Sequence, residues 1–250
     1  MNSSGDTSLP VHHLPEQTHS RHVIFAGFQY GDEDAPLLEA HVSVPQDGMP
    51  HAAVVLCHAN PAAGGSMEMK IVVGIEQALA GAGFATLRYN SRGVGASTGT
   101  VSRNHGKVLV APEGEPETED IGTALAFLGM QEGVDNRRMA LVGHSFGARI
   151  SLAYLAAHPE AGLGAVVCIG LPVAWRDLRY LGQWPHPKLF VTGERDDFCP
   201  PNKLAEYAAT LPEPKTVVTL RDTGHFFEER EANLAALVTE FLKKVLEANR

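Results

Sequence analysis

The chain has 250 residues, of which 44% are hydrophobic and 20% charged, a balance that excludes an intrinsically disordered protein. Its formal net charge is −9 and no run of Lys and Arg occurs, so we expect neither nucleic acid nor an anionic membrane as a partner. The three cysteines, Cys57, Cys168 and Cys199, have unrelated spacings and lie in or beside apolar runs. This pattern indicates buried free thiols rather than a disulfide framework.

The first 21 residues lack the basic start and apolar core of a signal peptide, and no apolar stretch long enough to span a membrane follows. We therefore expect a flexible tail over residues 1–21, one domain over residues 22–250, and a cytoplasmic protein. Scattered histidines of a flexible tail are usually solvated, so we expect no metal site at His12, His13, His19 and His22. No organic cofactor is implied, and a homodimer is left open.

Two strands of a hairpin are predicted first in the chain, over residues 22–30 and 37–44, with an acidic turn at residues 31–34. The run AAVVLCHA (Ala52–Ala59) is apolar throughout, as is typical of a strand buried on both faces of a parallel sheet. From there strands and helices alternate. Further strands are predicted over residues 84–90, 139–143, 165–170, 188–194 and 216–222. Helices are predicted over residues 66–80, 118–128, 146–157, 202–210 and 229–248.

This alternation predicts an α/β fold with a mostly parallel sheet of about eight strands and helices on both faces, because parallel neighbours need crossover helices. In such sheets the reactive groups gather in the loops at the carboxyl ends of the strands. One long connection, the polar stretch over residues 98–117, either covers that edge or is disordered.

The motif Gly143-His144-Ser145-Phe146-Gly147 follows a buried strand and precedes a helix. In that context G-x-S-x-G predicts a sharp turn that presents the serine hydroxyl, with small residues letting strand and helix approach. A serine needs a base to remove its proton and an acid to orient the base, in the chain order Ser, Asp or Glu, His on this scaffold. Asp196 or Asp197 and then His225 follow later strands, in that order.

Each of these residues also has an ordinary structural interpretation: Ser145 as a helix N-cap, one aspartate as a cap of the next helix, and His225 as a loop histidine. The conjunction of three signals favours the catalytic interpretation. An oxyanion would then be held by the backbone N–H of Phe146, at a helix start, and by that of Asn60, with Ala59 as the alternative.

Three further segments carry a family resemblance: HANPAAGGSMEMKIV, FATLRYNSRGVGASTG and DTGHFFEER. With the elbow motif, they resemble the α/β-hydrolase superfamily, and within it the small bacterial serine hydrolases related to dienelactone hydrolases, with a minimal cap. The resemblance covers roughly residues 23–247 and favours Asp196 over Asp197, because the acid of the family lies in G-x-x-D-x-x-x-P. True dienelactone hydrolases use Cys where this chain has Ser145, so the resemblance does not imply that substrate.

Residues 170–187 are too few for a lid domain of several helices. Their rings, Trp175, Tyr180 and Trp184, either line an apolar substrate pocket with Leu181 or pack as core on the sheet edge. Arg92 is interpreted as a structural hydrogen-bond donor rather than a substrate clamp, and His144 as a packing residue.

The sequence therefore predicts a serine hydrolase, an esterase of small to medium acyl substrates that uses Ser145, His225 and Asp196 without metal or cofactor. An acyltransferase, amidase or peptidase with the same triad, a non-catalytic scaffold, and non-hydrolytic chemistry on the same fold are the alternatives.

Overall fold

The computed structural model describes residues 18–26, 35–101, 116–174, 178 and 184–247. Eight strands form one sheet in this part of the chain. In chain order they are β1 (Thr18–Ala26), β2 (Leu37–Pro45), β3 (His51–Cys57), β4 (Ala85–Tyr89), β5 (Val134–His144), β6 (Ala165–Ile169), β7 (Lys188–Gly193) and β8 (Lys215–Leu220).

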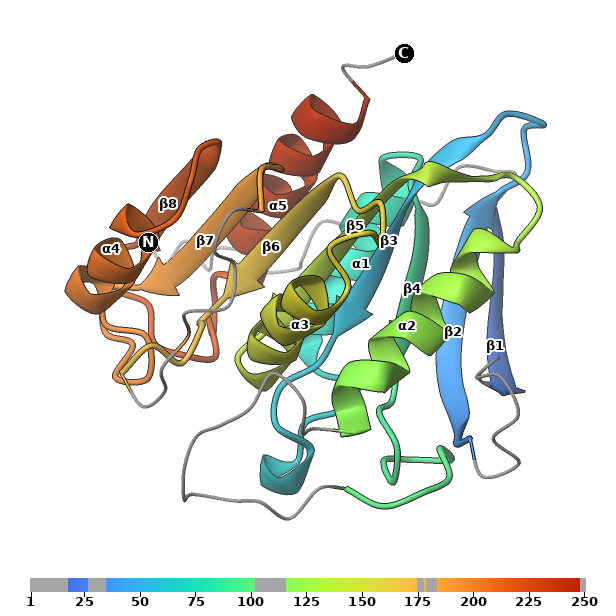
Figure 1. Cartoon of the computed structure of the whole chain (residues 1–250), viewed down its shortest axis with the longest axis horizontal. Coiled ribbons are helices and arrows are strands. Elements are labelled where there is room, and N and C mark those ends of the chain that lie inside the picture. Colours follow the sequence, from blue (N-terminus) through green and yellow to red (C-terminus); the bar gives the residue numbers. More distant parts are fainter. Residues whose placement is uncertain (1–17, 27–34, 102–115, 175–177, 179–183, 248–250) are drawn as a thin grey trace, which may run out of the picture.

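The strands lie in the order β1-β2-β4-β3-β5-β6-β7-β8, and all neighbours from β4 to β8 are parallel. Strand β2 pairs antiparallel with both of its neighbours, β1 and β4. Every residue of β3 is buried, as its continuous apolar run requires of a strand covered on both faces. The predicted mostly parallel sheet of about eight strands is confirmed, and Figure 1 shows its parallel arrows pointing toward one edge.

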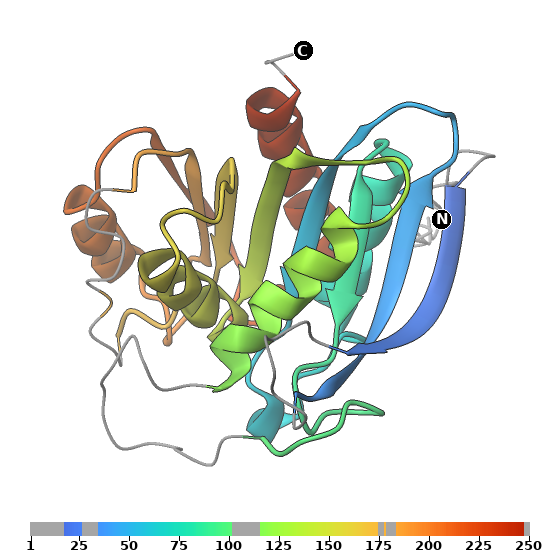
Figure 2. The same ribbon diagram turned by 45° about the vertical axis from the view of Figure 1, so that its right-hand side comes forward.

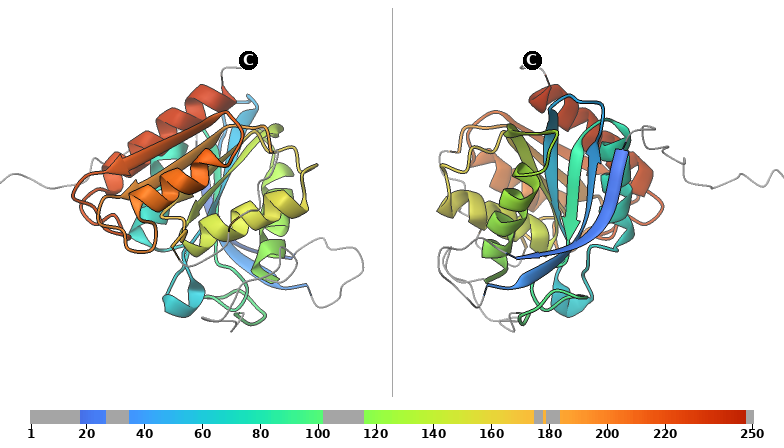
Figure 3. Two further views of the ribbon diagram at one scale, coloured as in Figure 1. Left: turned by 60° about the vertical axis from the view of Figure 1, so that its left-hand side comes forward. Right: turned by 90° about the vertical axis from the view of Figure 1, so that its right-hand side faces the viewer.

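Five α-helices and one short 3-10 helix occur in the described residues. They are η1 (Pro61–Ala63), α1 (Lys70–Gly81), α2 (Pro116–Gly129), α3 (Phe146–Ala157), α4 (Pro201–Ala209) and α5 (Glu231–Leu246). Figure 2 and Figure 3 show α1 and α5 on the face opposite α2 and α3. Each face has its own apolar core, one built with α1 and α5 and the other with α2, α3 and α4.

Strand β1 begins at Thr18, earlier than the sequence predicts. Residues 18–21, which the sequence analysis assigns to the tail, therefore pair with β2, and Thr18 lies opposite Pro45. Pairing with β2 satisfies the backbone N–H and C=O groups of these residues, which explains the longer strand. Most side chains of β1 are exposed, so no alternation of apolar and polar residues marks its start in the sequence.

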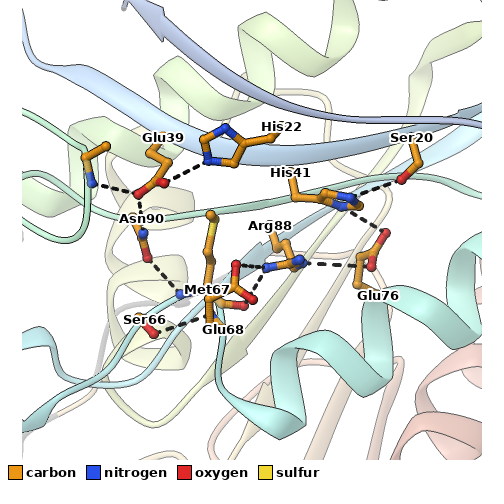
Figure 4. A network of polar contacts seen from close by, with 11 residues as sticks. Ser20, His22, Glu39, His41, Ser66, Met67, Glu68, Glu76, Arg88 and Asn90 are labelled. Carbon is orange, nitrogen blue, oxygen red and sulfur yellow. Dashed lines mark hydrogen bonds and ion pairs between the residues drawn. The ribbon is translucent and has the colours of Figure 1, made fainter.

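Helix α1 begins at Lys70, not at Ser66 as helical spacing predicts. The intervening backbone is bound to the end of β4 instead: the Met67 N–H donates to Asn90 Oδ1 at 2.8 Å, and Arg88 donates to the Met67 carbonyl at 3.1 Å. Figure 4 shows this network, in which Arg88 also reaches Glu68. These bonds place the segment between η1 and α1 against the sheet edge.

Helix α5 begins at Glu231, two residues after its predicted start. Phe227 and Glu229 have φ angles of 53° and 62°, which a right-handed helix cannot contain. The turn that they form separates His225 from the helix and leaves the histidine in a loop.

Two predicted features, the turn at residues 31–34 and most of the polar stretch over 98–117, lie outside the described residues. Between β6 and β7, residues 170–174, 178 and 184–187 are described and none of them is helical. In this part of the chain the structure therefore has no helical lid.

Candidate active site

Ser145 lies at a sharp turn between the last residue of β5 and the first of α3. Its φ of 55° is strained for a residue with a Cβ, and its N–H is held by the Ile169 carbonyl at 2.8 Å. The hydroxyl caps no amide of α3, so the N-cap interpretation fails. The turn therefore presents the hydroxyl instead of using it within the helix.

The two glycines of the motif allow the turn to pack closely against the neighbouring backbone. A Cβ on Gly147 would collide with the backbone of Cys57 and His58, and one on Gly143 with the backbone of Gly147 and Ala148. Without these Cβ atoms the start of α3 can lie directly against the end of β3. The close approach brings the serine next to the loop after β3.

The three predicted side chains meet at this edge of the sheet. His225 Nε2 lies 2.9 Å from Ser145 Oγ, and His225 Nδ1 lies 2.9 Å from Asp196 Oδ2. An ionised carboxylate only accepts hydrogen bonds, so Nδ1–H donates to Asp196 and Nε2 is left to accept from the serine hydroxyl. The arrangement can move a proton from Ser145 to the imidazole.

Asp196, rather than its neighbour Asp197, faces the histidine. The Asp196 carboxylate is buried, and its Oδ1 also accepts from the N–H groups of Phe198 and Cys199, both at 2.9 Å. Asp197 is exposed. These two N–H groups lie in the turn after β7. They hold the carboxylate in the position where it accepts a hydrogen bond from His225.

His144 supports the loop that carries His225. Its ring is buried, and Nε2–H donates to the His225 carbonyl at 3.0 Å. Burial, with a smaller contribution from the nearby His225, lowers the pKa of His144 to about 4, so the ring is neutral near pH 7. The sequence predicts only a packing role for His144, because a hydrogen bond to a carbonyl 81 positions away cannot be inferred from a local motif.

The loop after β3 carries the predicted oxyanion donors. Asn60 caps η1 through a bond from the Ala62 N–H to its Oδ1, at 3.0 Å. In the described residues, the N–H groups of Asn60, Ala59 and Phe146 have no hydrogen-bond acceptor. All three residues line the cavity beside Ser145. Asn60 and Ala59 therefore both stay candidates for the second donor.

A cavity of about 250 Å³ opens at Ser145 and is mostly apolar. Several residues that line it are not predicted from the sequence. These are Ala63, Gly64, Gly65, Met69, Arg149, Pro172, Phe198 and Phe226. Two of them had a signal in the sequence: Arg149 follows Ser145 by one helical turn, and Phe226 is adjacent to His225.

Of the aromatic residues predicted for the pocket, the structure describes only Trp184. Trp184 is buried in the apolar core with α3 and α4, and it is not among the described residues that line the cavity. Its carbonyl accepts from Lys188 Nζ at 2.9 Å, and the ammonium lies 5.3 Å from the ring centroid. This matches the core-packing alternative. Trp175, Tyr180 and Leu181 lie outside the described residues.

Arg92 has a structural partner, as the sequence predicts. Its backbone N–H, Nε and Nη2 all donate to the carboxylate of Asp120, at 2.6–2.9 Å. The carboxylate is fully buried, so this ion pair ties the loop after β4 to α2.

The described residues contain no group of three His, Cys, Asp or Glu side chains arranged to hold a metal ion. They also contain no helix with the length and apolar character that crossing a bilayer requires.

Comparison with known proteins shows similarity to α/β hydrolases. The sequence profile of the alpha/beta hydrolase fold matches residues 52–182. An α/β serine hydrolase of Xanthomonas campestris without a lid superposes with a TM-score of 0.72 and 25% identity, covering 93% of this chain and 96% of the other.

Two more proteins extend the comparison. An α/β serine hydrolase homologue of Coxiella burnetii has a TM-score of 0.71 and 25% identity, over 88% of this chain and 96% of that one. An uncharacterized protein of Rickettsia prowazekii is 25% identical over 202 residues, which is 77% of this chain and 79% of that protein.

Proposed function

The chain belongs to the α/β hydrolase fold family, and from this premise we propose that it is a serine hydrolase that cleaves carboxylic esters of small to medium acyl groups. The nucleophile is Ser145, the general base is His225, and Asp196 orients the base. The single observation that carries the proposal is the continuous hydrogen-bonded series from Ser145 Oγ through His225 to Asp196, with both contacts at 2.9 Å.

In the first half-reaction, Ser145 Oγ attacks the ester carbonyl carbon as its proton passes to His225 Nε2. The carbonyl electrons move to the oxygen, which becomes an oxyanion. When they return, the bond to the leaving alcohol breaks, and that oxygen takes the proton from Nε2. An acyl-enzyme on Ser145 and a free alcohol result.

In the second half-reaction, His225 takes a proton from water as the water oxygen attacks the acyl carbon. Collapse of this second oxyanion breaks the bond to Oγ and returns the proton to Ser145, which releases the carboxylic acid. Asp196 stays ionised throughout and stabilises the imidazolium, while its two backbone donors keep it in place.

Both oxyanions form beside the N–H of Phe146, at the N-terminus of α3, where the helix dipole adds a partial positive charge. The Asn60 or Ala59 N–H supplies the second donor. The absence of an acceptor for these groups in the described residues supports the assignment, because a free carbonyl oxygen can then approach both. The cavity of about 250 Å³ supports a substrate of modest size.

The test is hydrolysis of 4-nitrophenyl butyrate by the wild-type protein and by Ser145→Ala, combined with fluorophosphonate labelling followed by mass spectrometry. We expect the label on Ser145 and loss of turnover in Ser145→Ala. Ser20→Ala, which removes a hydroxyl on the edge strand β1, is the matched control and should retain both. Turnover that persists in Ser145→Ala, or a wild-type protein that takes no label, would refute the proposal.

A further inference from the structure

Two phenylalanine rings are exposed to solvent beside the cavity at Ser145. Every other phenylalanine of the described residues is buried or partly buried, whereas Phe198 is 43% and Phe226 51% exposed. A single exposed apolar side chain is common on protein surfaces and has no special meaning. Here both exposed rings line the cavity and flank the His225 imidazole, with centroid distances of 4.6 Å and 5.3 Å. The apolar surface exposed beside the general base is therefore aromatic.

Neighbouring side chains hold Phe226 in place. Its ring lies edge-on to the His225 imidazole, at 78°, and edge-on to the buried His144 ring, with centroids 6.4 Å apart. The next residue, Phe227, is fully buried in the apolar core built with α1 and α5. The buried ring anchors the turn that carries Phe226. Because Phe226 is already held, binding a ligand costs little additional side-chain entropy.

Sheet topology places the two exposed rings on one side of Ser145. The strand order β3-β5-β6-β7-β8 puts the elbow after β5 between two groups of loops. The loop after β3 lies on one side, and the loops after β7 and β8, which carry Phe198 and Phe226, lie on the other. The leaving alcohol must receive its proton from His225, which also follows β8, so it lies on the side of the rings.

The opposite side of the cavity differs in character. None of the described lining residues that follow β3 is aromatic, and four of them are small: Ala59, Ala63, Gly64 and Gly65. The remaining ring of the cavity, Phe146, has the guanidinium carbon of Arg149 5.0 Å from its centroid. The exposed aromatic surface of the site is thus on the alcohol side.

We propose that Phe226 binds the alcohol part of the substrate, which makes esters of uncharged alcohols that carry an aromatic ring the preferred substrate class. This inference rests on the proposed ester hydrolysis. A bound ring covers apolar surface of Phe226 that otherwise contacts water, and aromatic rings in edge-to-face or offset contact attract each other beyond this burial. Phe226 determines specificity and takes no part in the proton transfers.

The experiment compares two isomeric esters by titration of the acid released. In 2-phenylethyl propanoate the ring is on the alcohol part, and in ethyl 3-phenylpropanoate it is on the acid part. Both have unbranched carbons on each side of the ester group, so they differ mainly in where the ring lies. We expect the wild-type protein to hydrolyse 2-phenylethyl propanoate with the higher kcat/KM. The ratio of the two kcat/KM values should fall about fivefold to thirtyfold in Phe226→Ala, as expected for loss of contact with one half-exposed ring.

Three further variants narrow the interpretation. Phe226→Tyr keeps the ring and should retain the ratio. Phe226→Leu keeps an apolar side chain without the ring and should retain part of it, and it replaces Phe226→Ala if that variant fails to fold. Met130→Ala removes another exposed apolar side chain, which lies between α2 and β5 at the opposite edge of the sheet, and should leave the ratio unchanged.

Failure of this inference is distinguishable from failure of the proposed function. A wild-type protein that takes the fluorophosphonate label on Ser145 and hydrolyses 4-nitrophenyl butyrate, yet prefers ethyl 3-phenylpropanoate or does not discriminate, overturns the inference alone. A Phe226→Ala variant that slows both isomers equally also overturns it, because the ring then supports His225 and does not bind the alcohol part. Absence of label and of turnover in the wild-type protein refutes the proposed function instead.

Discussion

His58 Nε2 accepts two hydrogen bonds from Ser91, one from its backbone N–H at 3.1 Å and one from its hydroxyl at 2.7 Å. The opposite nitrogen, Nδ1–H, donates to the Ala59 carbonyl at 2.6 Å. A single buried imidazole thus connects the loop after β3, which carries the proposed oxyanion donors, to the loop after β4. Its neutral form is required, because Nε2 must be an acceptor.

The first prediction concerns this connection. Ser91→Ala removes the shorter of the two bonds to His58 and should lower the free energy of unfolding by about 1 kcal/mol. It should also lower kcat for 4-nitrophenyl butyrate, because the loop with Asn60 loses part of its support. Urea unfolding and steady-state kinetics measure the two effects. Stability and kcat both equal to those of the wild-type protein would contradict the proposed role of the bond.

The second prediction separates the two adjacent aspartates. Asp196→Asn should lower kcat/KM by about 10³- to 10⁴-fold, because an amide no longer holds His225 in the tautomer that accepts the serine proton. Asp197→Asn, at the exposed neighbouring position, should leave kcat/KM close to the wild-type value. Equal losses in both variants, with intact folding by circular dichroism, would show that the carboxylate facing the histidine is not the one that matters.

The third prediction compares two glycines of helices. A Cβ at Gly147 would collide with the Cys57 and His58 backbone, so Gly147→Ala should destabilise the protein by about 1–3 kcal/mol and impair turnover. A Cβ at Gly74, within α1, meets no atom within 4 Å. Gly74→Ala should therefore stabilise the protein by about 0.5–1 kcal/mol through helix propensity. Thermal or urea unfolding of both variants provides the comparison, and a change of the same sign in the two would contradict it.

The fourth prediction is a pH dependence of stability. Burial lowers the pKa of His58 and of His144 to about 4, from the ordinary histidine value of about 6.5. Below pH 6.5 the unfolded chain binds protons at these positions and the folded protein does not, so stability is present above pH 6.5 and is lost as the pH falls toward 4. Each histidine contributes a slope of up to about 1.4 kcal/mol per pH unit.

Urea unfolding between pH 7.5 and pH 5 tests this dependence on the wild-type protein and on His144→Gln. The variant has one buried imidazole fewer, so its stability should decline less steeply with decreasing pH, whatever its absolute stability. A slope identical to that of the wild-type protein would show that His144 is protonated in the folded state over this range.

Much of the architecture follows from local patterns that tertiary contacts do not override. The apolar run at Ala52–Ala59 has one stable environment, a strand covered on both faces, and β3 is such a strand. Helix α3 begins at Phe146 as predicted, since Ser145 and the glycines around it define the turn before it. Helix α1 begins later than its helical spacing predicts, because hydrogen bonds between Met67 and the side chains of Asn90 and Arg88 hold the backbone before Lys70, and these partners are distant in sequence.

The sequence by itself determined which residues have the chemistry for a site: a serine in a strand–turn–helix motif, then an acid and a histidine at later strand ends. Order along the chain and strand alternation suffice for this, because parallel strands bring their carboxyl ends to one edge. The family resemblance already favoured Asp196 over Asp197, and the contact with His225 agrees with it. Only the tertiary structure decided that His144 supports the histidine loop, that Trp184 packs in the core, and that Arg149 lines the cavity. The physical reason is that side-chain direction and burial depend on contacts between segments far apart in the chain, which no local pattern encodes.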